Sequence, residues 1–259
     1  YVSYACPWAH RTMLLRALRG LEGAIGLTAV DPRMGEDGWS FGEESDPLFG
    51  ARLLQEVYLR AAPRCTSRVT VPVLWDKQTN TLVSNESREI MRMLDTAFDA
   101  FALNPTSLAP AALLPLIDDT ITANYGSINN GVYKAGFATE QAAYEEACRA
   151  LFAALDRNEE TLGRSRFLCG DLLTEADIAL FTTLLRFDVV YYAHFKCNLK
   201  RIADYPNLSR FLREIYALPA VRATCRLDHI KTHYYWSQTT VNPTRIVPIG
   251  PDLSVLDGR

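Results

Sequence analysis

The feature that most constrains this chain is a cysteine directly before a proline near the N-terminus, in the run YACPWAHR over residues 4–11. Proline fits the first turn of a helix, where its missing N–H would have no partner. The run therefore predicts a strand that ends on Cys6 and a helix that begins at Pro7. A thiol in that place faces the unpaired N–H groups and the positive end of the helix dipole, which lower a cysteine pKa from about 8.5 toward roughly 3.5–7.5. We expect Cys6 to be a nucleophile.

Residue 9, which would carry the second thiol of a two-cysteine redox motif, is alanine. Cys6 cannot close a local disulfide, so a thiol from another molecule must resolve any mixed disulfide that forms on it. This indicates a small-molecule thiol as co-substrate. The alternative is that Cys6 is an inert buried thiol, which is a common fate of cysteine. Such a thiol, however, has no need of a helix that starts with Cys-Pro.

Length and charge favour a protein that acts on small molecules. The 259 residues, 48% of them hydrophobic, are enough for one large or two modest cores. The net charge is −3, and no run of Lys and Arg is long enough to follow a phosphate backbone, which argues against nucleic acid as a partner.

The chain shows no sign of a membrane or secreted protein. No apolar stretch approaches the roughly 20 residues that span a bilayer, and no signal-peptide pattern is visible. We therefore expect a soluble cytoplasmic protein. Tyr1 falls inside the predicted first strand, so we expect upstream residues, with or without a targeting peptide, to complete that strand. The other cysteines have neither the close pairs of a zinc site nor the density of a disulfide scaffold, so we predict reduced structural thiols and no metal at Cys65, Cys148, Cys169, Cys197 and Cys225.

The first hundred residues alternate between strand and helix signals. The sequence predicts a strand into Cys6, a helix to about Leu18, a strand near 24–30, a hairpin from 70–75 and 81–83, and a helix over 86–98. An insertion over 31–68 is rich in Gly, Asp and Glu. We expect one helix in it, from about 49 to 61, and an exposed Trp39.

After a linker near 100–110, the apolar residues recur with helical period alone. Thr174 and Asp177 are spaced as a capping box at the start of one of these helices. From 231 onward the helical period fades and prolines recur, which predicts an irregular tail. We therefore divide the chain into residues 1–99 with the insertion 31–68, an all-α domain over 100–230, and a tail over 231–259.

Two further segments suit a peptide-like ligand. A cis bond between Val71 and Pro72 would leave backbone groups of Val71 free to pair with such a ligand, although a trans proline at a strand edge is the alternative. The run SNES over residues 84–87 opens a helix, whose N–H groups with the Ser87 hydroxyl suit a carboxylate. Glu86 suits an ammonium group. The alternative is an ordinary helix cap with an acidic first turn.

Together these segments resemble the glutathione transferase superfamily, and more closely its glutathionyl-hydroquinone reductases, the Xi class. The superfamily resemblance lies in CPWAHR (6–11), RVTVPVLWD (68–76), NES (85–87) and the all-α second half. The class resemblance adds INNGVYK (128–134), RFD (186–188), HFKCN (194–198), HYY (233–235) and NP (242–243). The resemblance covers nearly the whole chain. One departure is Gln238, where the class pattern has histidine.

The resemblance implies an α/β thioredoxin-like N-terminal domain followed by an all-α domain, in a homodimer. It implies glutathione as co-substrate, bound by Glu86, Ser87 and Val71 with Trp8, Trp39 and Arg68 completing the pocket. Tyr133 and Tyr234 would face the second substrate, a glutathionylated hydroquinone. For any tyrosine in a chain with 12 of them, the alternative is an ordinary core aromatic.

The implied reaction removes glutathione from the hydroquinone by way of a Cys6–glutathione mixed disulfide and releases oxidised glutathione. An omega-like thiol transferase or dehydroascorbate reductase would share that intermediate without the tyrosine pair. A transferase-like fold can also serve as a ligand carrier or scaffold. A scaffold, however, needs no polarised thiol.

Overall fold

The computed structural model describes residues 1–257. Its N-terminal part is built on helix α1, which begins at Pro7 and ends at Leu18 as predicted. The other regular elements of this part are α2 (Leu54–Ala61), β1 (Leu74–Asp76), β2 (Thr81–Ser84), α3 (Ser87–Thr96) and the short 3₁₀ turn η1 (Asp99–Phe101). The two strands pair antiparallel, which confirms the predicted hairpin, although its first strand is shorter than expected.

The C-terminal part is helical throughout, as predicted. Helix α7 starts at the predicted capping box, in which the N–H and hydroxyl of Thr174 both donate to Asp177 Oδ2 (2.8 and 2.9 Å). No helix of residues 1–257 is long and apolar enough to cross a membrane. The elements are η2 (Ala111–Leu113), α4 (Leu114–Asn124), η3 (Tyr125–Asn129), α5 (Gly131–Gly136), α6 (Gln141–Leu162), α7 (Glu175–Arg186), η4 (Phe187–Tyr191), η5 (Ile202–Asp204), α8 (Pro206–Tyr216), α9 (Pro219–Arg222), α10 (Leu227–Ser237) and η6 (Ser254–Asp257).

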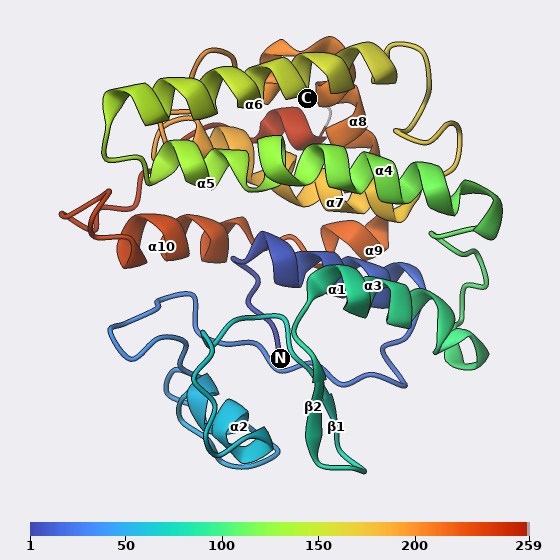
Figure 1. The fold of residues 1–259 in the computed structure, drawn as a ribbon, viewed down its shortest axis with the longest axis vertical. Coiled ribbons are helices and arrows are strands. Elements are labelled where there is room, and N and C mark those ends of the chain that lie inside the picture. Colours follow the sequence, from blue (N-terminus) through green and yellow to red (C-terminus); the bar gives the residue numbers. More distant parts are fainter. Residues whose placement is uncertain (258–259) are drawn as a thin grey trace.

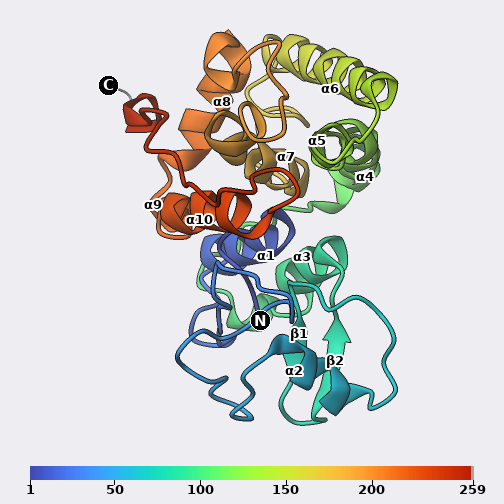
Figure 2. The same ribbon diagram turned by 90° about the vertical axis from the view of Figure 1, so that its left-hand side faces the viewer.

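Helix α1 lies between the two parts of the molecule. Figures 1 and 2 show it against α3 on one side and below the helical bundle on the other, where it packs on α7. Its residues Leu14 and Leu15 join the large core of the bundle. Its residues Ala9 and Met13 join a second core, formed with the insertion and the segment around Val71. Two cores therefore meet at the helix that begins beside Cys6.

The strand predicted near 24–30 does not form. Only an isolated parallel bridge joins Val2 and Ala29. The N–H groups of Ala24 and Ile25 donate to the carbonyl of Leu21 (3.0 and 2.8 Å), and this turn takes the backbone groups that a strand would need.

The helix predicted over 49–61 is also shorter than expected, because it begins at Leu54. Gly50 has a φ of +67°, which is incompatible with a right-handed helix. Residues 47–49 form a turn instead, and Leu53 pairs with Ser40 in an isolated antiparallel bridge.

Two predictions about exposed or irregular residues are wrong. Trp39 is only 8% exposed, because its ring stacks on His233. Helix α10 continues past residue 230 to Ser237, so the irregular tail begins later than predicted. Ile230, His233 and Tyr234 are buried on one face of α10, and this packing stabilises a helix that its own sequence period does not indicate.

Candidate active site

The start of α1 has the geometry expected of a nucleophile at a helix N-terminus. Cys6 is the N-cap residue, with φ −75° and ψ 123°, and Pro7 is the first helical residue. The Cys6 thiol donates to the carbonyl oxygen of Val71 at 3.6 Å. Two predicted site residues from distant parts of the sequence are thus in contact.

The protein around the sulfur sets the acidity of Cys6. The residue as a whole is half-buried, but its sulfur lies inside the protein, and this loss of solvent raises the thiol pKa above its ordinary value. The N–H of Ala9, the guanidinium of Arg186, the N–H of Trp8 and the guanidinium of Arg11 act in the opposite direction. The helix start therefore favours the thiolate as predicted, but the predicted net lowering of the pKa is wrong for this structure.

Arg186, the last residue of α7, holds the segment before Cys6. Its Nε donates to the carbonyl of Ala5 (2.8 Å) and its Nη2 to the carbonyl of Tyr4 (2.9 Å). The side chain is fully buried. Because α7 belongs to the helical part, these two bonds fix the nucleophile's position relative to both parts of the molecule.

His10 supports this anchor as a neutral ring. Arg186 Nη1 can only donate, so His10 Nδ1, 3.2 Å away, is the acceptor and the ring proton is on Nε2. That proton is donated to Thr224 Oγ1 (2.8 Å). Burial lowers the pKa of His10 well below its ordinary value, so the ring stays neutral. Both ring nitrogens are therefore engaged, and His10 is not a base for Cys6.

A cavity of about 400 Å³ lies beside the start of α1 and takes residues from both parts of the chain. Four predicted glutathione-binding residues line it, namely Trp8, Val71, Glu86 and Ser87. The other lining residues were not predicted as site residues. Arg11, Thr70, Asn85 and Asn130 lie within the motifs quoted above, whereas Arg88, Ile121, Thr122 and Tyr125 lie outside them.

The start of α3 forms one wall of this cavity. Glu86 is the N-cap residue and makes no side-chain capping bond, so its exposed carboxylate is available to a ligand. Ser87 is the first helical residue and is buried. The Val71–Pro72 bond is cis, as predicted. This wall thus presents backbone groups, a hydroxyl and a carboxylate.

Tyr58, which the sequence reasoning missed, joins two edges of the cavity. Its hydroxyl donates to the carbonyl of Thr70 (2.8 Å) and accepts from Asn85 Nδ2 (3.1 Å). The signal was available, because Leu54, Val57 and Tyr58 share the apolar face of α2.

Five predicted site residues do not line this cavity. Three are the predicted catalytic residues Cys6, Tyr133 and Tyr234, and two are predicted glutathione-binding residues, Arg68 and Trp39. Arg68 is exposed. The ring of Trp39 lies 4.8 Å from that of His233 and stacks on it. Trp39 therefore packs the insertion against α10, next to Tyr234, instead of joining the other predicted glutathione-binding residues.

Tyr133 and Tyr234 are brought together by the fold, and a third tyrosine joins them. Their hydroxyl oxygens lie 2.5 Å apart, and the hydroxyl of Tyr191 lies 2.9 Å from that of Tyr234. Tyr133 is half-buried, whereas Tyr234 and Tyr191 are 1% and 0% exposed. Burial raises the pKa of all three phenols, and the charge of a thiolate at Cys6 further raises the pKa of Tyr133 and Tyr191. The three hydroxyls therefore stay protonated, and two of them, those of Tyr133 and Tyr191, lie within electrostatic reach of Cys6.

Two π-helical turns bring aromatic residues into this region. The turn η3 carries Tyr125 at its start, between α4 and α5, and η4 ends on Tyr191, after α7. Such turns insert one extra residue into a helix and are frequent at functional sites. Sequence period does not reveal them, which is why Tyr191 was missed although it lies between two of the quoted motifs.

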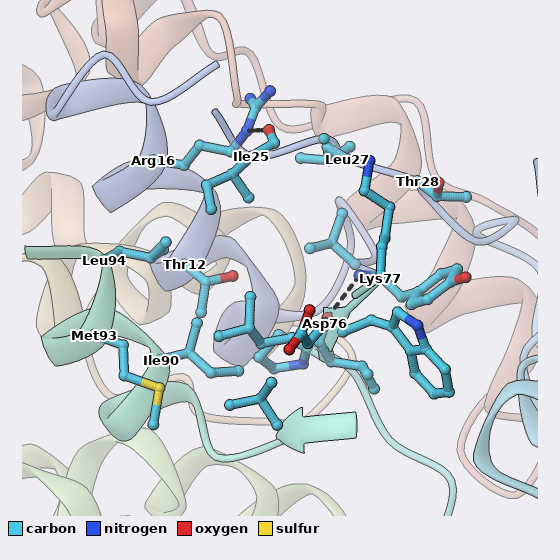
Figure 3. Close-up of a pocket in the computed structure, with 18 of the residues that line it drawn as sticks. Thr12, Arg16, Ile25, Leu27, Thr28, Asp76, Lys77, Ile90, Met93 and Leu94 are labelled. Carbon is cyan, nitrogen blue, oxygen red and sulfur yellow. Dashed lines mark hydrogen bonds between the residues drawn. The ribbon is translucent and has the colours of Figure 1, made fainter. Parts of the chain in front are cut away.

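A larger cavity, of about 760 Å³, lies in the N-terminal part, between α1, the hairpin and α3 (Figure 3). Thr12, Leu27, Asp76 and Met93 are among its lining residues. None of the predicted site residues lines it, so the smaller cavity beside Cys6 is the candidate active site.

Comparisons with known proteins agree with this geometry. The family model of the glutathione S-transferase N-terminal domain matches residues 5–97. The family model of the C-terminal domain matches residues 141–214. Glutathionyl-hydroquinone reductase YqjG of Escherichia coli is 52% identical over 100% of this chain and 81% of the relative. Glutathionyl-hydroquinone reductase PcpF of Sphingobium chlorophenolicum is 51% identical over 97% of this chain and 82% of the relative.

Solved structures give the same answer. The glutathione-bound structure of YqjG has a TM-score of 0.96 at 51% identity, and covers 98% of this chain and 85% of that one. The Xi glutathione S-transferase of Phanerochaete chrysosporium has a TM-score of 0.94 at 52% identity, and covers 98% and 89%.

A small N-terminal α/β domain joined to an all-α domain, each matched by its family model, is the glutathione transferase fold. The chain belongs to the glutathione S-transferase family and, within it, to the Xi class.

Proposed function

We propose that this chain uses glutathione to reduce S-glutathionyl hydroquinones to hydroquinones, through a mixed disulfide between Cys6 and glutathione. The observation that carries the proposal is the chain of protonated tyrosine hydroxyls within electrostatic reach of a sulfur at a helix N-terminus. Two relatives that share about half of the sequence are named glutathionyl-hydroquinone reductases, which supports the same reaction.

Glutathione would lie in the cavity beside Cys6. The exposed carboxylate of Glu86 suits the ammonium of the γ-glutamyl group, and the start of α3 with Ser87 suits its carboxylate. Backbone groups of Val71 would pair with the cysteinyl part, and Trp8 would cover it. This binding mode leaves Trp39 and Arg68 outside the pocket, so we assign Trp39 a packing role on α10.

The bond to be broken explains why tyrosines are needed. An aryl carbon–sulfur bond does not yield to attack at sulfur while the ring is aromatic, since the leaving group would be an aryl carbanion. Tautomerisation, in which the ring carbon that carries sulfur gains a proton and a ring hydroxyl loses one, gives a dienone. The Cys6 thiolate then attacks the glutathione sulfur, the carbon–sulfur bond breaks, and its electron pair enters the ring to give a phenolate.

A second glutathione completes the cycle. Its thiolate attacks the glutathione sulfur of the mixed disulfide, which forms oxidised glutathione and returns the Cys6 thiolate. The hydroquinone thus gains the two electrons that two glutathione sulfurs lose.

The tyrosines form a directed chain of donors. Each hydroxyl has a single proton to donate. If Tyr133 donates to the phenolate, Tyr234 must donate to Tyr133 and Tyr191 to Tyr234, which matches the two oxygen–oxygen distances of 2.5 and 2.9 Å. Tyr133, the least buried of the three, is thus the direct donor. The hydrogen bonds from the two buried hydroxyls strengthen the bond that Tyr133 donates.

The test is a turnover assay with glutathionyl-menadiol, a glutathionyl-chlorohydroquinone and dehydroascorbate side by side. We expect the two glutathionyl-hydroquinones to be the preferred substrates. Preference for dehydroascorbate would reassign the chain to omega-like thiol transfer, and no turnover of any of them would favour a carrier or scaffold.

We also propose a cytoplasmic homodimer. The exposed side chains of Ile246 and Ile249, 68% and 101% accessible in the tail, support self-association. Sedimentation of the wild type and of Ile249→Asp tests this, because a tail-mediated dimer should dissociate in the variant.

A further inference from the structure

Two arginines beside Cys6 carry charges that no carboxylate balances. Arg11 and Arg186 are 1% and 0% exposed. Among the buried arginines of residues 1–257, only Arg19 forms ion pairs, with Asp95 and Asp99. An unpaired ion inside a protein is costly. The burial of these two charges therefore indicates that each arginine has a specific role.

Every guanidinium nitrogen of Arg186 donates at least one hydrogen bond to a neighbouring residue. Its Nε and Nη2 hold the carbonyls of Ala5 and Tyr4, and its Nη1 donates to Thr182 O (2.7 Å) and to His10. Removal of this side chain would free the segment before Cys6. Arg186 is therefore a positioning residue.

Arg11 has a donor to spare. Its Nη2 donates to the carbonyl of Ala179 (3.2 Å), which also accepts from Asn129 Nδ2 (3.0 Å). Its Cζ lies 4.3 Å from the centre of the Trp8 ring. Its Nε has no hydrogen-bond partner within the described residues, and the side chain lines the cavity beside Cys6.

The titratable groups that face Arg11 are all able to become anions. They are the thiol of Cys6 and the phenols of Tyr125, Tyr133 and Tyr191, and each of them favours the charged form of Arg11. Burial lowers the pKa of Arg11 to about 10, so the guanidinium still carries its charge at neutral pH.

The charged and titratable groups around the sulfur come from four elements. They are Arg11 on α1, Arg186 on α7, Tyr133 on α5 and Tyr191 on η4. Only the two arginines are cations, and Arg186 has the larger effect on the pKa of Cys6. Of the two, only Arg11 has a guanidinium nitrogen without a hydrogen-bond partner among the described residues.

We propose that Arg11 is the counter-ion of the Cys6 thiolate, and that its charge keeps the sulfur reactive in a site that otherwise disfavours an anion. The cation has no carboxylate to balance it while Cys6 is a thiol, and the thiolate supplies the opposite charge when the proton leaves. The same charge is in place for the phenolate that forms as the thiolate is consumed. The proposal rests on the proposed role of Cys6 as the nucleophile.

The test measures alkylation of Cys6 by iodoacetamide against pH, with the adduct read by peptide mass spectrometry. Arg11→Met removes the charge at similar volume, and Arg11→Gln removes it but keeps an amide donor. Arg11→Lys keeps a cation. Arg16→Met is the matched control, because Arg16 lies on the same helix and donates away from the site, to Ile25 O at 2.7 Å.

We expect about tenfold slower alkylation at neutral pH in both neutral variants, with the pH midpoint moved up. Arg11→Lys and Arg16→Met should stay close to the wild type. An unchanged midpoint in Arg11→Met or Arg11→Gln would overturn the proposal. Tenfold slower alkylation in Arg11→Lys would also overturn it. This variant provides the test if neither neutral variant folds. The assay contains no hydroquinone, so a wrong substrate assignment leaves its outcome unaffected.

Discussion

The imidazole of His233 stacks on the indole of Trp39, with ring centroids 4.8 Å apart and planes 20° from parallel. Its Nδ1 lies 3.0 Å from the carbonyl of Pro32, to which it donates. One side chain of α10 thus ties the insertion to the residue next to Tyr234. Burial keeps the ring neutral, because the pKa of His233 is lowered even though the bond to Pro32 acts to raise it.

This contact makes stability depend on pH. Burial lowers the pKa of His233 to about 4, whereas the unfolded chain has the ordinary value of about 6.5. Between these values the unfolded state binds a proton that the folded state does not, so stability is complete above about pH 6.5 and falls as the pH drops toward 4. We expect the free energy of unfolding to lose up to about 3 kcal/mol over that window through this residue.

Urea unfolding of the wild type and of His233→Asn at a series of pH values measures the effect. The amide of asparagine can replace the donor to Pro32 but does not titrate. Burial also lowers the pKa of His10, His194 and His229, so the variant should keep a shallower slope. Identical slopes would show that His233 is not the titrating group.

Cys6→Ser should abolish turnover and leave the fold and glutathione binding intact, because it removes the nucleophile and little volume. After exposure to oxidised glutathione, mass spectrometry of the wild type should find an adduct on Cys6. Cys65→Ser is the control, since that half-buried thiol contacts the Ser67 hydroxyl at 3.0 Å and does not cap a helix. Labelling elsewhere while Cys6 stays free would contradict the proposed mechanism.

Glu86→Ala should weaken glutathione binding by about tenfold or more, as expected for a lost hydrogen bond to a charged group. Calorimetry gives the affinity. The rate of Cys6 alkylation should not change, because Glu86 is proposed to bind the far end of glutathione. Glu43→Ala, which removes an exposed carboxylate that does not line the cavity, should bind normally. Normal binding by Glu86→Ala as well would leave Glu86 with only its place at the helix start.

Tyr133→Phe should slow reduction of glutathionyl-hydroquinones by about 10²–10³, the usual effect of losing one donor to a developing oxyanion. Reduction of a simple mixed disulfide should change far less, because no phenolate leaves. Tyr234→Phe should show the same contrast, since it removes the donor behind Tyr133. Tyr192→Phe is the control, because Tyr192 lies outside the hydroxyl chain. Equal slowing of both reactions would mean that the tyrosines only support the site.

Gly136→Ala should disturb the tyrosine chain indirectly, by displacing the ring that packs against Tyr191. A methyl group at residue 136 would overlap the ring of Phe195, which is fully buried and stacks on Tyr191 at 5.4 Å. Overpacking of this kind costs about 1–3 kcal/mol. We expect lower stability in urea together with slower hydroquinone reduction.

The matched control is Gly131→Ala on the same helix, where the added methyl would meet Leu151 at an ordinary 3.8 Å. That variant should be neutral or slightly stabilised. Similar stability losses in both variants would mean that the loss comes from replacing glycine by alanine in this helix, and not from overlap with Phe195.

The local parts of the site could be predicted from the sequence, because short-range chemistry determines them. A proline after Cys6 fixes where α1 begins, and the run before Ser87 fixes where α3 begins. The strand near 24–30 failed for a local reason as well, since the turn at Leu21 takes its first backbone groups.

The parts that the sequence could not reveal are those that tertiary packing brings together. Arg186 reaches Ala5 across 181 residues of sequence, and no spacing rule connects the two. Tyr191 enters the tyrosine chain through a π-helical turn, which leaves no mark in the hydrophobic period. Trp39 was misplaced because its partner, His233, comes from the far end of the chain.

The reach of Arg186 from the end of α7 to the carbonyls before Cys6 limits how this enzyme could be recombined. A chimera that kept the N-terminal half and exchanged the bundle would still contain the thiol, the cis bond and the start of α3. It would lose the two bonds that aim the thiol, unless the donor bundle also ended its corresponding helix on an arginine. An exchange of intact domains is therefore expected to preserve the position of the thiol only if the new helical domain already carries an arginine at the end of the corresponding helix.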